Sequence, residues 1–486
     1  MPKTTSEIRP RRLLEQSMVA QEIADCEQEM LALEKAMIDL KYKRMSLDTK
    51  MNTVSDPMAM LPLDVTTEIF AIVNDSQDRT DFSSLPALFL LGRICKTWRN
   101  IVWNRPFLWK DIAIRLSYNK YAKQERLLEE WLNRSGACQL YYNIASHRHW
   151  EPPESFATLI LKTASRWKSF KCISPLTSLF DEIASHTFPA LSTIELDFGN
   201  WNNDFNINAP RLRKIQILSH WPVLEIYDNW QQLTKVSLKL PIDHVLNLIQ
   251  HLDQVQALFL ESTGLTEVTS LQPIVPKELL HLSHLKITGR NKWASRILTA
   301  VTVPALSNLE LHFTKMPATN TLWMDGVENL LRRSSFSLAT LNLQNINLKE
   351  ELGLDFLKSF VTLSSLSLRH QSHGLSDLTI NRLNPNANGR STECLLPALT
   401  HLDYSGRINF KAKTLTTMLE QRLAVSQTNP LIKALRVVDI TYLNASWAQT
   451  GDLANPNRVQ AFYRDISDLA SHGTVLKVMW DENSRL

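Results

Sequence analysis

The side chains in this chain that could do chemistry are few and widely spaced. The histidine pairs His147/His149 and His281/His284 lack the cysteine or carboxylate neighbours of a zinc site. Five cysteines lie along the chain without a Cys-x-x-Cys pair, which argues against both a zinc site and a disulfide framework. The glycine-rich phosphate-binding, zinc-protease and serine-hydrolase signatures do not occur. We therefore expect no catalytic residue, no metal, no cofactor and no enzymatic activity.

Recognition of another protein is a better match to the residue types present. Polar side chains alternate with leucines through much of the chain, and alternate residues of a strand share one face of a sheet. We assign target binding to the concave face so formed, with these candidates: Glu195, Gln216, Lys239, Phe259, Lys286, Glu310 and Arg369. Mixed charges beside Phe259 favour a protein partner, because a nucleic-acid groove would need repeated lysine or arginine.

The elements that must position these residues are copies of the spacing Leu-x-x-Leu-x-Leu, with conservative replacements. Ten copies occur at intervals of 21 to 36 residues, from Leu191/Ile194/Leu196 to Leu435/Val438/Ile440. Weaker copies begin at Trp167 and Val475. Each copy predicts a short strand whose leucines point into a shared core, so that neighbouring copies stack into a parallel sheet.

The longer intervals contain amphipathic helices, for example around 415–423 and 459–469. The repeated spacing resembles the leucine-rich repeat. It predicts an α/β solenoid over residues 167–486 with a C-terminal cap.

The apolar residues of 61–110 recur at helical spacing, and this pattern predicts a small all-α module of three short helices that is very rich in apolar side chains. A module of about 50 residues cannot enclose this many large rings in its own core, and leftover apolar area usually marks a partner surface. The rings are Phe70, Phe89, Trp98, Trp103, Phe107 and Trp109. We expect some of them to face another protein; the alternative is that they pack only on the downstream repeats.

This module resembles the F-box. The matching elements are Leu61-Pro62, Ile69-Phe70, Cys95-Lys-Thr-Trp98-Arg99 and Phe107-Leu108-Trp109. The resemblance implies docking to the Skp adaptor of a cullin-RING ubiquitin ligase. On these positions we expect the adaptor contacts to be Leu61, Pro62, Ile69, Phe70, Cys95, Trp98 and Trp109.

Residues 16–51 predict a coiled-coil helix. Two seam positions repeat every seven residues, and nine of the ten residues from Val19 to Met51 at these positions are apolar, Arg44 being the exception. The flanking positions are acidic in the first half and mostly basic in the second, which favours antiparallel or heterotypic pairing. The competing interpretation is a helix folded back on its own domain. The polar composition of residues 1–15 predicts a disordered tail. The proline of Asp56-Pro57 should break the helix, so we expect a linker over 52–60.

A connecting segment is predicted over 111–166. Tyr121–Arg134 should form a helix stopped by Gly136, followed by a strand from Gln139. The run Trp131-Leu-Asn-Arg-Ser-Gly136 after the module resembles an element of fungal F-box proteins that also begin with a heptad helix.

The composition fits these predictions. The 486 residues include 75 leucines and 12 glycines, and 53 lysines and arginines balance 49 acids. This balance gives no reason to expect a nucleic-acid or membrane partner, and no apolar stretch resembles a signal peptide or membrane span. We expect a soluble protein of the cytoplasm or nucleus.

Three functions are compatible with this organisation. The first is a substrate-recognition subunit of a cullin-RING (SCF-type) ubiquitin ligase. The second is a non-ligase scaffold built from coiled coil and repeats. The third is a regulator such as a GTPase activator with an exposed arginine, for which Arg369 is a candidate.

Overall fold

A computed structural model of the chain describes residues 8–76, 86–146, 150–173, 176–197, 207–220, 228–263, 275–314, 322–346, 350–386, 394–443 and 475–481. The predicted helix at 459–469 and the pair His147/His149 lie outside these residues. The chain divides into two compact units. Unit 1 comprises Met1–Lys110 and Glu130–Cys138, and unit 2 comprises Asp111–Glu129 and Gln139–Leu486. None of the helices described here is long and apolar enough to cross a membrane.

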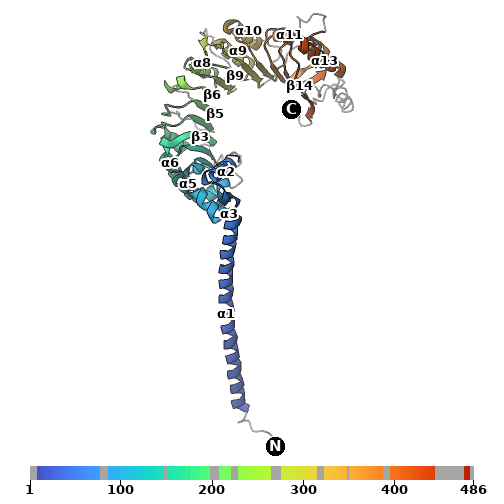
Figure 1. Cartoon of the computed structure of the whole chain (residues 1–486). Helices are drawn as coiled ribbons and strands as arrows, with labels where there is room; N and C mark the ends of the chain where they lie inside the picture. The colour runs from blue at the N-terminus through green and yellow to red at the C-terminus, as the bar shows by residue number, and fades with distance from the viewer. Residues whose placement is uncertain are drawn as a thin grey trace. The chain divides into compact units, whose positions relative to one another are not determined.

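Unit 1 begins with one long helix, α1 (Ile8–Ser55; Figure 1). The predicted coiled-coil helix is therefore confirmed as a helix, but the disordered tail is wrong for residues 8–15. Pro10 did not prevent this, because a proline is tolerated in the first turn of a helix. The helix ends just before Asp56-Pro57, where a short 3₁₀ helix, η1 (Pro57–Met60), begins.

The rest of unit 1 is a small helical module, as predicted. Its elements are α2 (Leu63–Asp75), α3 (Ala87–Ile94), α4 (Lys96–Trp103) and the 3₁₀ helix η2 (Pro106–Trp109). Phe70, Leu88, Val102 and Leu108 form its buried core. Residues Glu130–Cys138, at the end of helix α5 (Tyr121–Arg134), also belong to this unit. Helix α5 has its predicted bounds, and Gly136 follows it with a positive φ of 53°.

Unit 2 is an α/β solenoid built on one 14-stranded sheet whose neighbouring strands all pair in parallel. Its strands are β1 (Asp111–Arg115), β2 (Leu140–Ala145), β3 (Trp167–Ile173), β4 (Thr193–Asp197), β5 (Lys214–His220), β6 (Lys235–Leu240), β7 (Ala257–Ser262), β9 (His284–Gly289), β11 (Asn308–Phe313), β12 (Thr340–Gln344), β13 (Ser365–Ser376), β14 (His401–Asn409), β15 (Val437–Leu443) and β16 (Val475–Asp481). A separate pair joins β8 (Lys277–Glu278) and β10 (Val301–Thr302).

Every predicted copy of the leucine spacing corresponds to a strand of this sheet. Equivalent leucines pair in register: Leu285 of β9 lies opposite Leu309 of β11, which lies opposite Leu341 of β12. All three are fully buried. The predicted stacking of copies into a parallel sheet is therefore confirmed.

The predicted start of the solenoid at residue 167 is wrong. Strands β1 and β2 extend the same sheet, so the segment 111–166 does not form a separate connection. Ile112 and Ile114 of β1 alternate toward the core, but five residues are too few to show the repeat spacing in the sequence.

Helices cover one face of the sheet and leave the other open (Figure 1). The helices between the strands are α6 (Glu154–Leu161), α7 (Thr177–Ile183), α8 (Ile242–Gln250), α9 (Asn291–Ala300), α10 (Leu322–Ser334), α11 (Glu350–Leu357), α12 (Asp377–Leu383) and α13 (Ala412–Thr428), and the described 3₁₀ turns of this unit are η3 (Tyr118–Lys120), η4 (Ala164–Arg166) and η5 (Asp228–Gln232). Strand leucines point toward this covered face, so the residues between them line the opposite one, which we call the open face.

Candidate functional site

Two surfaces carry the predicted binding residues, one in each unit. The first is an aliphatic stripe that begins at Leu61 and continues along helix α2. Leu61, Val65 and Ile72 recur at helical spacing and are 38%, 45% and 60% exposed. The opposite side of α2 carries Thr67 and Phe70, which are buried. Helix α2 therefore shows apolar surface on both sides, and only one side is used by the module's own core.

The large rings of the module do not form this surface. Trp109 is almost fully buried, and its ring lies edge-on to those of Phe89, Trp103 and Trp131. Its indole N–H donates to the Val102 carbonyl at 2.8 Å. The expectation that these rings are left uncovered for a partner is therefore wrong for Trp109.

Residues from the end of α5 explain this burial. Trp131 donates its indole N–H to the Trp109 carbonyl at 3.0 Å. The Arg134 guanidinium lies 4.9 Å from the ring centroid of Trp103 and 5.3 Å from that of Trp109. An arginine over an aromatic face is attracted to it and covers it from water. Two side chains from outside the predicted module thus complete its ring cluster.

Phe70 and Trp98 have internal partners too. Their ring centroids are 5.0 Å apart, and the Trp98 indole N–H donates to both oxygens of the Asp56 carboxylate, at 2.8 and 3.0 Å. Asp56 also accepts from the Met58 N–H at 2.9 Å, which caps η1. The Cys95 sulfur accepts from the Trp98 N–H at the start of α4. These contacts connect the end of α1 to helix α4.

The seven predicted adaptor contacts therefore separate into three groups. Leu61 and Pro62 are exposed and available to a partner, while Ile69, Cys95 and Trp98 are half-buried. Phe70 and Trp109 are buried, and their assignment as contacts is wrong: both support the module from inside. Sequence reasoning missed Val65 and Ile72 as surface residues, because an apolar helical stripe in a small module looks the same whether it faces a core or a partner.

The second surface is the open face of unit 2. Paired strands bring its central residues into one row, in which Glu195 is followed by Gln216, Ser237, Phe259, Lys286 and Glu310 on successive strands. The predicted positions of these side chains on one face are therefore confirmed by the strand register.

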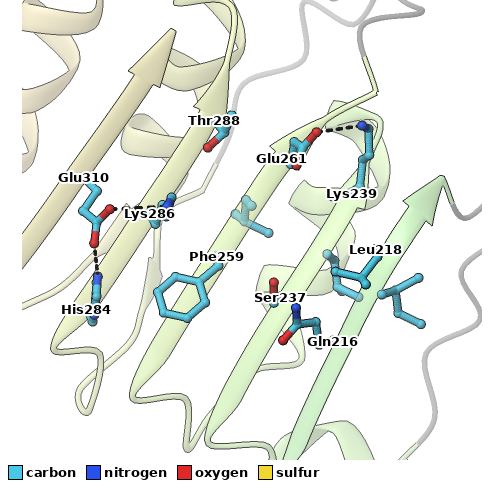
Figure 2. A pocket seen from close by; sticks show the side chains of 13 residues that line it. Gln216, Leu218, Ser237, Lys239, Phe259, Glu261, His284, Lys286, Thr288 and Glu310 are labelled. Atoms are coloured by element: carbon cyan, nitrogen blue, oxygen red, sulfur yellow. Dashed lines mark hydrogen bonds and ion pairs between the residues drawn. The ribbon is translucent and has the colours of Figure 1, made fainter. Parts of the chain in front are cut away.

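Five of the seven predicted target-binding residues line one hollow in this face. The hollow has a volume of about 350 Å³ and is lined by Gln216, Lys239, Phe259, Lys286 and Glu310, together with Leu218, Glu261 and His284. Figure 2 shows the Phe259 ring lying between Ser237 on one side and the His284, Lys286 and Glu310 group on the other. Glu195 and Arg369 lie on the same face but do not line the hollow.

Charged groups in the hollow are paired with each other. Lys239 contacts Glu261 at 2.6 Å, and Glu310 contacts His284 at 2.8 Å and Lys286 at 3.5 Å (Figure 2). Burial alone would raise the pKa of Glu310, but the hydrogen bond from His284 and the positive charge of Lys286 outweigh it and hold this pKa below its usual value. The carboxylate is thus charged and partnered near neutral pH.

Phe259 is the apolar centre of this arrangement. The His284 ring packs edge-on against it with centroids 4.9 Å apart, and Lys235 Nζ lies 5.2 Å from its centroid. Sequence reasoning gave His284 no role. Its position two residues before Lys286 on the same strand places it on the same face, and this spacing could have identified it.

Outside the hollow, the two remaining predicted residues are also paired. Glu195 contacts Lys171 at 2.7 Å. Arg369 contacts Asp403 at 2.7 Å, and Asp403 also accepts from the Ser367 hydroxyl at 2.9 Å. Arg369 is thus held in an ion pair on the open face, and no observation on the described residues favours the GTPase-activator hypothesis.

No group of three or more histidine, cysteine, aspartate or glutamate side chains could hold a metal ion in the part of the chain that the structure describes. In comparisons with known proteins, no family model matches the chain and no curated protein matches it in sequence.

Proposed function

We propose that this chain is a substrate-receptor subunit of a cullin-RING ubiquitin ligase. In this proposal the helical module of unit 1 docks a Skp-type adaptor, and the open face of unit 2 binds the target protein. The chain needs no catalytic residue, because holding a target lysine near a charged ubiquitin carrier raises the effective concentration of the two reactants.

The observation that carries the proposal is the exposed aliphatic stripe of α2. Leu61, Val65 and Ile72 lie in the part of the module that resembles an F-box, beside the exposed Pro62. Apolar side chains that remain this exposed together usually mark a protein interface. Phe70 and Trp98, packed behind the stripe, keep α2 fixed against α4.

Binding of the full chain to a purified Skp-type adaptor tests the proposal. Val65→Asp places a charge in the stripe and should abolish co-purification, because a buried unpaired carboxylate costs several kcal/mol. Val361→Asp is the matched control, since Val361 is an exposed valine of unit 2. Adaptor binding that survives Val65→Asp would contradict docking through α2.

The alternative function is a non-ligase scaffold in which the module only completes unit 1. The burial of Phe70 and Trp109 favours it, since most of the rings already have internal partners. The same experiment separates the two functions: a scaffold without an adaptor would show no co-purification of the unmodified chain.

A further inference from the structure

Helix α1 carries an apolar seam that no residue of the described chain covers. Its eight large apolar seam side chains are each more than half exposed: Val19, Ile23, Met30, Leu33, Met37, Leu40, Leu47 and Met51. The ninth apolar position is the exposed, free Cys26. The helix is 48 residues long, about 70 Å at 1.5 Å per residue. A seam of this length is stable in water only when it packs against another helix.

We propose that the partner is α1 of a second copy of this chain, packed antiparallel. The charges beside the seam support this choice. In an antiparallel pair, residues at equivalent flanking positions of the two helices face each other. One flanking row contains Glu22, Glu29, Lys43 and Lys50, with Ala36 at its centre. When the same row of the second copy runs in the opposite direction, its lysines lie opposite the glutamates of the first copy.

The seam fixes the register. We place residue 35 of one helix opposite residue 35 of the other. Two seam residues then face each other when their residue numbers add up to 70. Ile23 then packs on Leu47 of the second copy, Met30 on Leu40, and Met37 on Leu33. The exception, Arg44, faces Cys26 of the second copy.

The same register pairs the charges, and the flanking residues on the two sides of the seam face partners whose numbers add up to 72 in one row and 68 in the other. Glu22 faces Lys50 of the second copy, and Glu29 faces Lys43. In the other flanking row Glu27 faces Lys41, and each of these three pairs occurs twice by symmetry. Among the charged flanking residues, only Glu34 meets its own equivalent.

A parallel, in-register pair is much less favourable. It sets Glu22 against Glu27 and Glu29 against Glu34, each twice, and places Arg44 against Arg44 in the seam. In the antiparallel pair Arg44 instead lies within about one helical turn of Glu22, Glu27 and Glu29 of the second copy. Like charges facing each other destabilise a pair, so the charge pattern selects the antiparallel orientation.

The area is sufficient for a stable dimer. The pair brings together nine apolar seam side chains from each chain. At about 60 Å² or more each they bury roughly 1,100 Å², which passes the ~1,000 Å² that a biological interface should clear.

Crosslinking of the full chain tests the orientation directly. The variant Arg44→Cys places a thiol against Cys26 of the second copy, so a short bis-maleimide should give 26–44 links between chains, identified by peptide mapping. In a parallel pair Cys26 would lie eighteen residues, about 27 Å, from position 44 of the partner. Links of 44 to 44 and 26 to 26 would overturn the proposal, as would a monomeric unmodified chain at micromolar concentration.

A charge exchange supplies a second, independent measurement. Lys43→Glu with Lys50→Glu makes one flanking row wholly acidic, and Glu22→Lys with Glu29→Lys makes it wholly basic. Four facing pairs become repulsive in each homodimer, so its dissociation constant in sedimentation equilibrium should rise at least about 50-fold. An equimolar mixture should recover the dimer, because every pair in the row is then opposite in charge. Unchanged homodimers, or a mixture that stays monomeric while both variants remain helical, would contradict the antiparallel register.

Discussion

Truncation of residues on the two sides of α2 should separate binding from stability. Full burial of an aliphatic side chain contributes about 1.5–3 kcal/mol. Leu61, Val65 and Ile72 are roughly half exposed, so the surface left for a partner gives about 1 kcal/mol each. Replacing all three by alanine should weaken adaptor binding by about 3 kcal/mol, more than 100-fold in the dissociation constant. The free energy of unfolding should change little, because exposed substitutions usually stay within about 0.5 kcal/mol each.

Phe70→Ala should show the opposite pattern. Phe70 is 1% exposed and packs on Trp98, so its truncation should cost about 3–5 kcal/mol of stability. At temperatures well below its lowered unfolding midpoint, this variant should still bind the adaptor with a dissociation constant within a few-fold of that of the unmodified chain. Isothermal titration calorimetry and tryptophan-monitored denaturation measure the two effects. Equal adaptor affinity for the triple variant and the unmodified chain would refute our assignment of the stripe as the docking surface.

Two further predictions concern unit 2. Arg422 is fully buried and donates to five backbone carbonyls, including those of Leu383 and Leu396. Arg422→Met should therefore lower the free energy of unfolding by about 3–5 kcal/mol. It should also reduce the protection of backbone amides in α12 and α13 from hydrogen exchange. The exposed Lys413→Met is the control, and equal protection in both would contradict this role. Burial and the positive charge of Lys286 lower the pKa of His312 below its usual 6.5, so the unfolded chain binds the proton more tightly. The contribution of His312 to the free energy of unfolding should be complete above about pH 6.5 and should fall as the pH drops toward the lowered pKa. His312→Asn should therefore flatten the dependence of the thermal unfolding midpoint on pH. His401→Gln, at an exposed position of the same face, is the control, and an equal change in that variant would argue against His312.

The strands of unit 2 were predictable because each carries the same buried leucines. Residues such as Leu258, Leu285 and Leu309 have no exposed surface, and one spacing recurs because every strand packs against a neighbour of the same kind. The position of the intervening polar residues on the open face was predictable as well, because alternate side chains of a strand point to opposite faces of the sheet. The burial of Glu310 among Lys286 and His284 did not follow, because it depends on the register of adjacent strands.

A side-chain ladder between repeats was missed for a different reason. In several copies a serine or threonine follows the first leucine and donates its hydroxyl to a backbone carbonyl of the preceding repeat. Ser192 donates to Lys168 at 3.1 Å, Ser307 to Ser283 at 3.1 Å and Thr400 to Ser364 at 3.0 Å. Hydroxyl residues are common in turns, so the sequence alone gives no reason to assign them this role.

The burial of the rings near residue 100 could not be derived from residues 61–110. Counting apolar side chains correctly indicated more surface than this segment could enclose, but Trp131 and Arg134 come from about 25 residues further along the chain and cover Trp109. The apolar area left exposed is therefore mainly aliphatic: it lies on α2 and at Leu90 and Ile94 of α3, and Phe107 is the one large ring among the six of this module that is exposed, at 37%.

The pairing within the hollow determines what kind of target it can bind. Lys239 and Glu261 neutralise each other, as do Lys286 and Glu310, so long-range attraction of a charged target gives little affinity. A partner that covers these pairs must remove water from them, which is costly unless it supplies hydrogen bonds of its own. Phe259 offers apolar contact at their centre. A target segment that combines a large apolar side chain with flanking polar groups therefore fits this face better than a uniformly charged one.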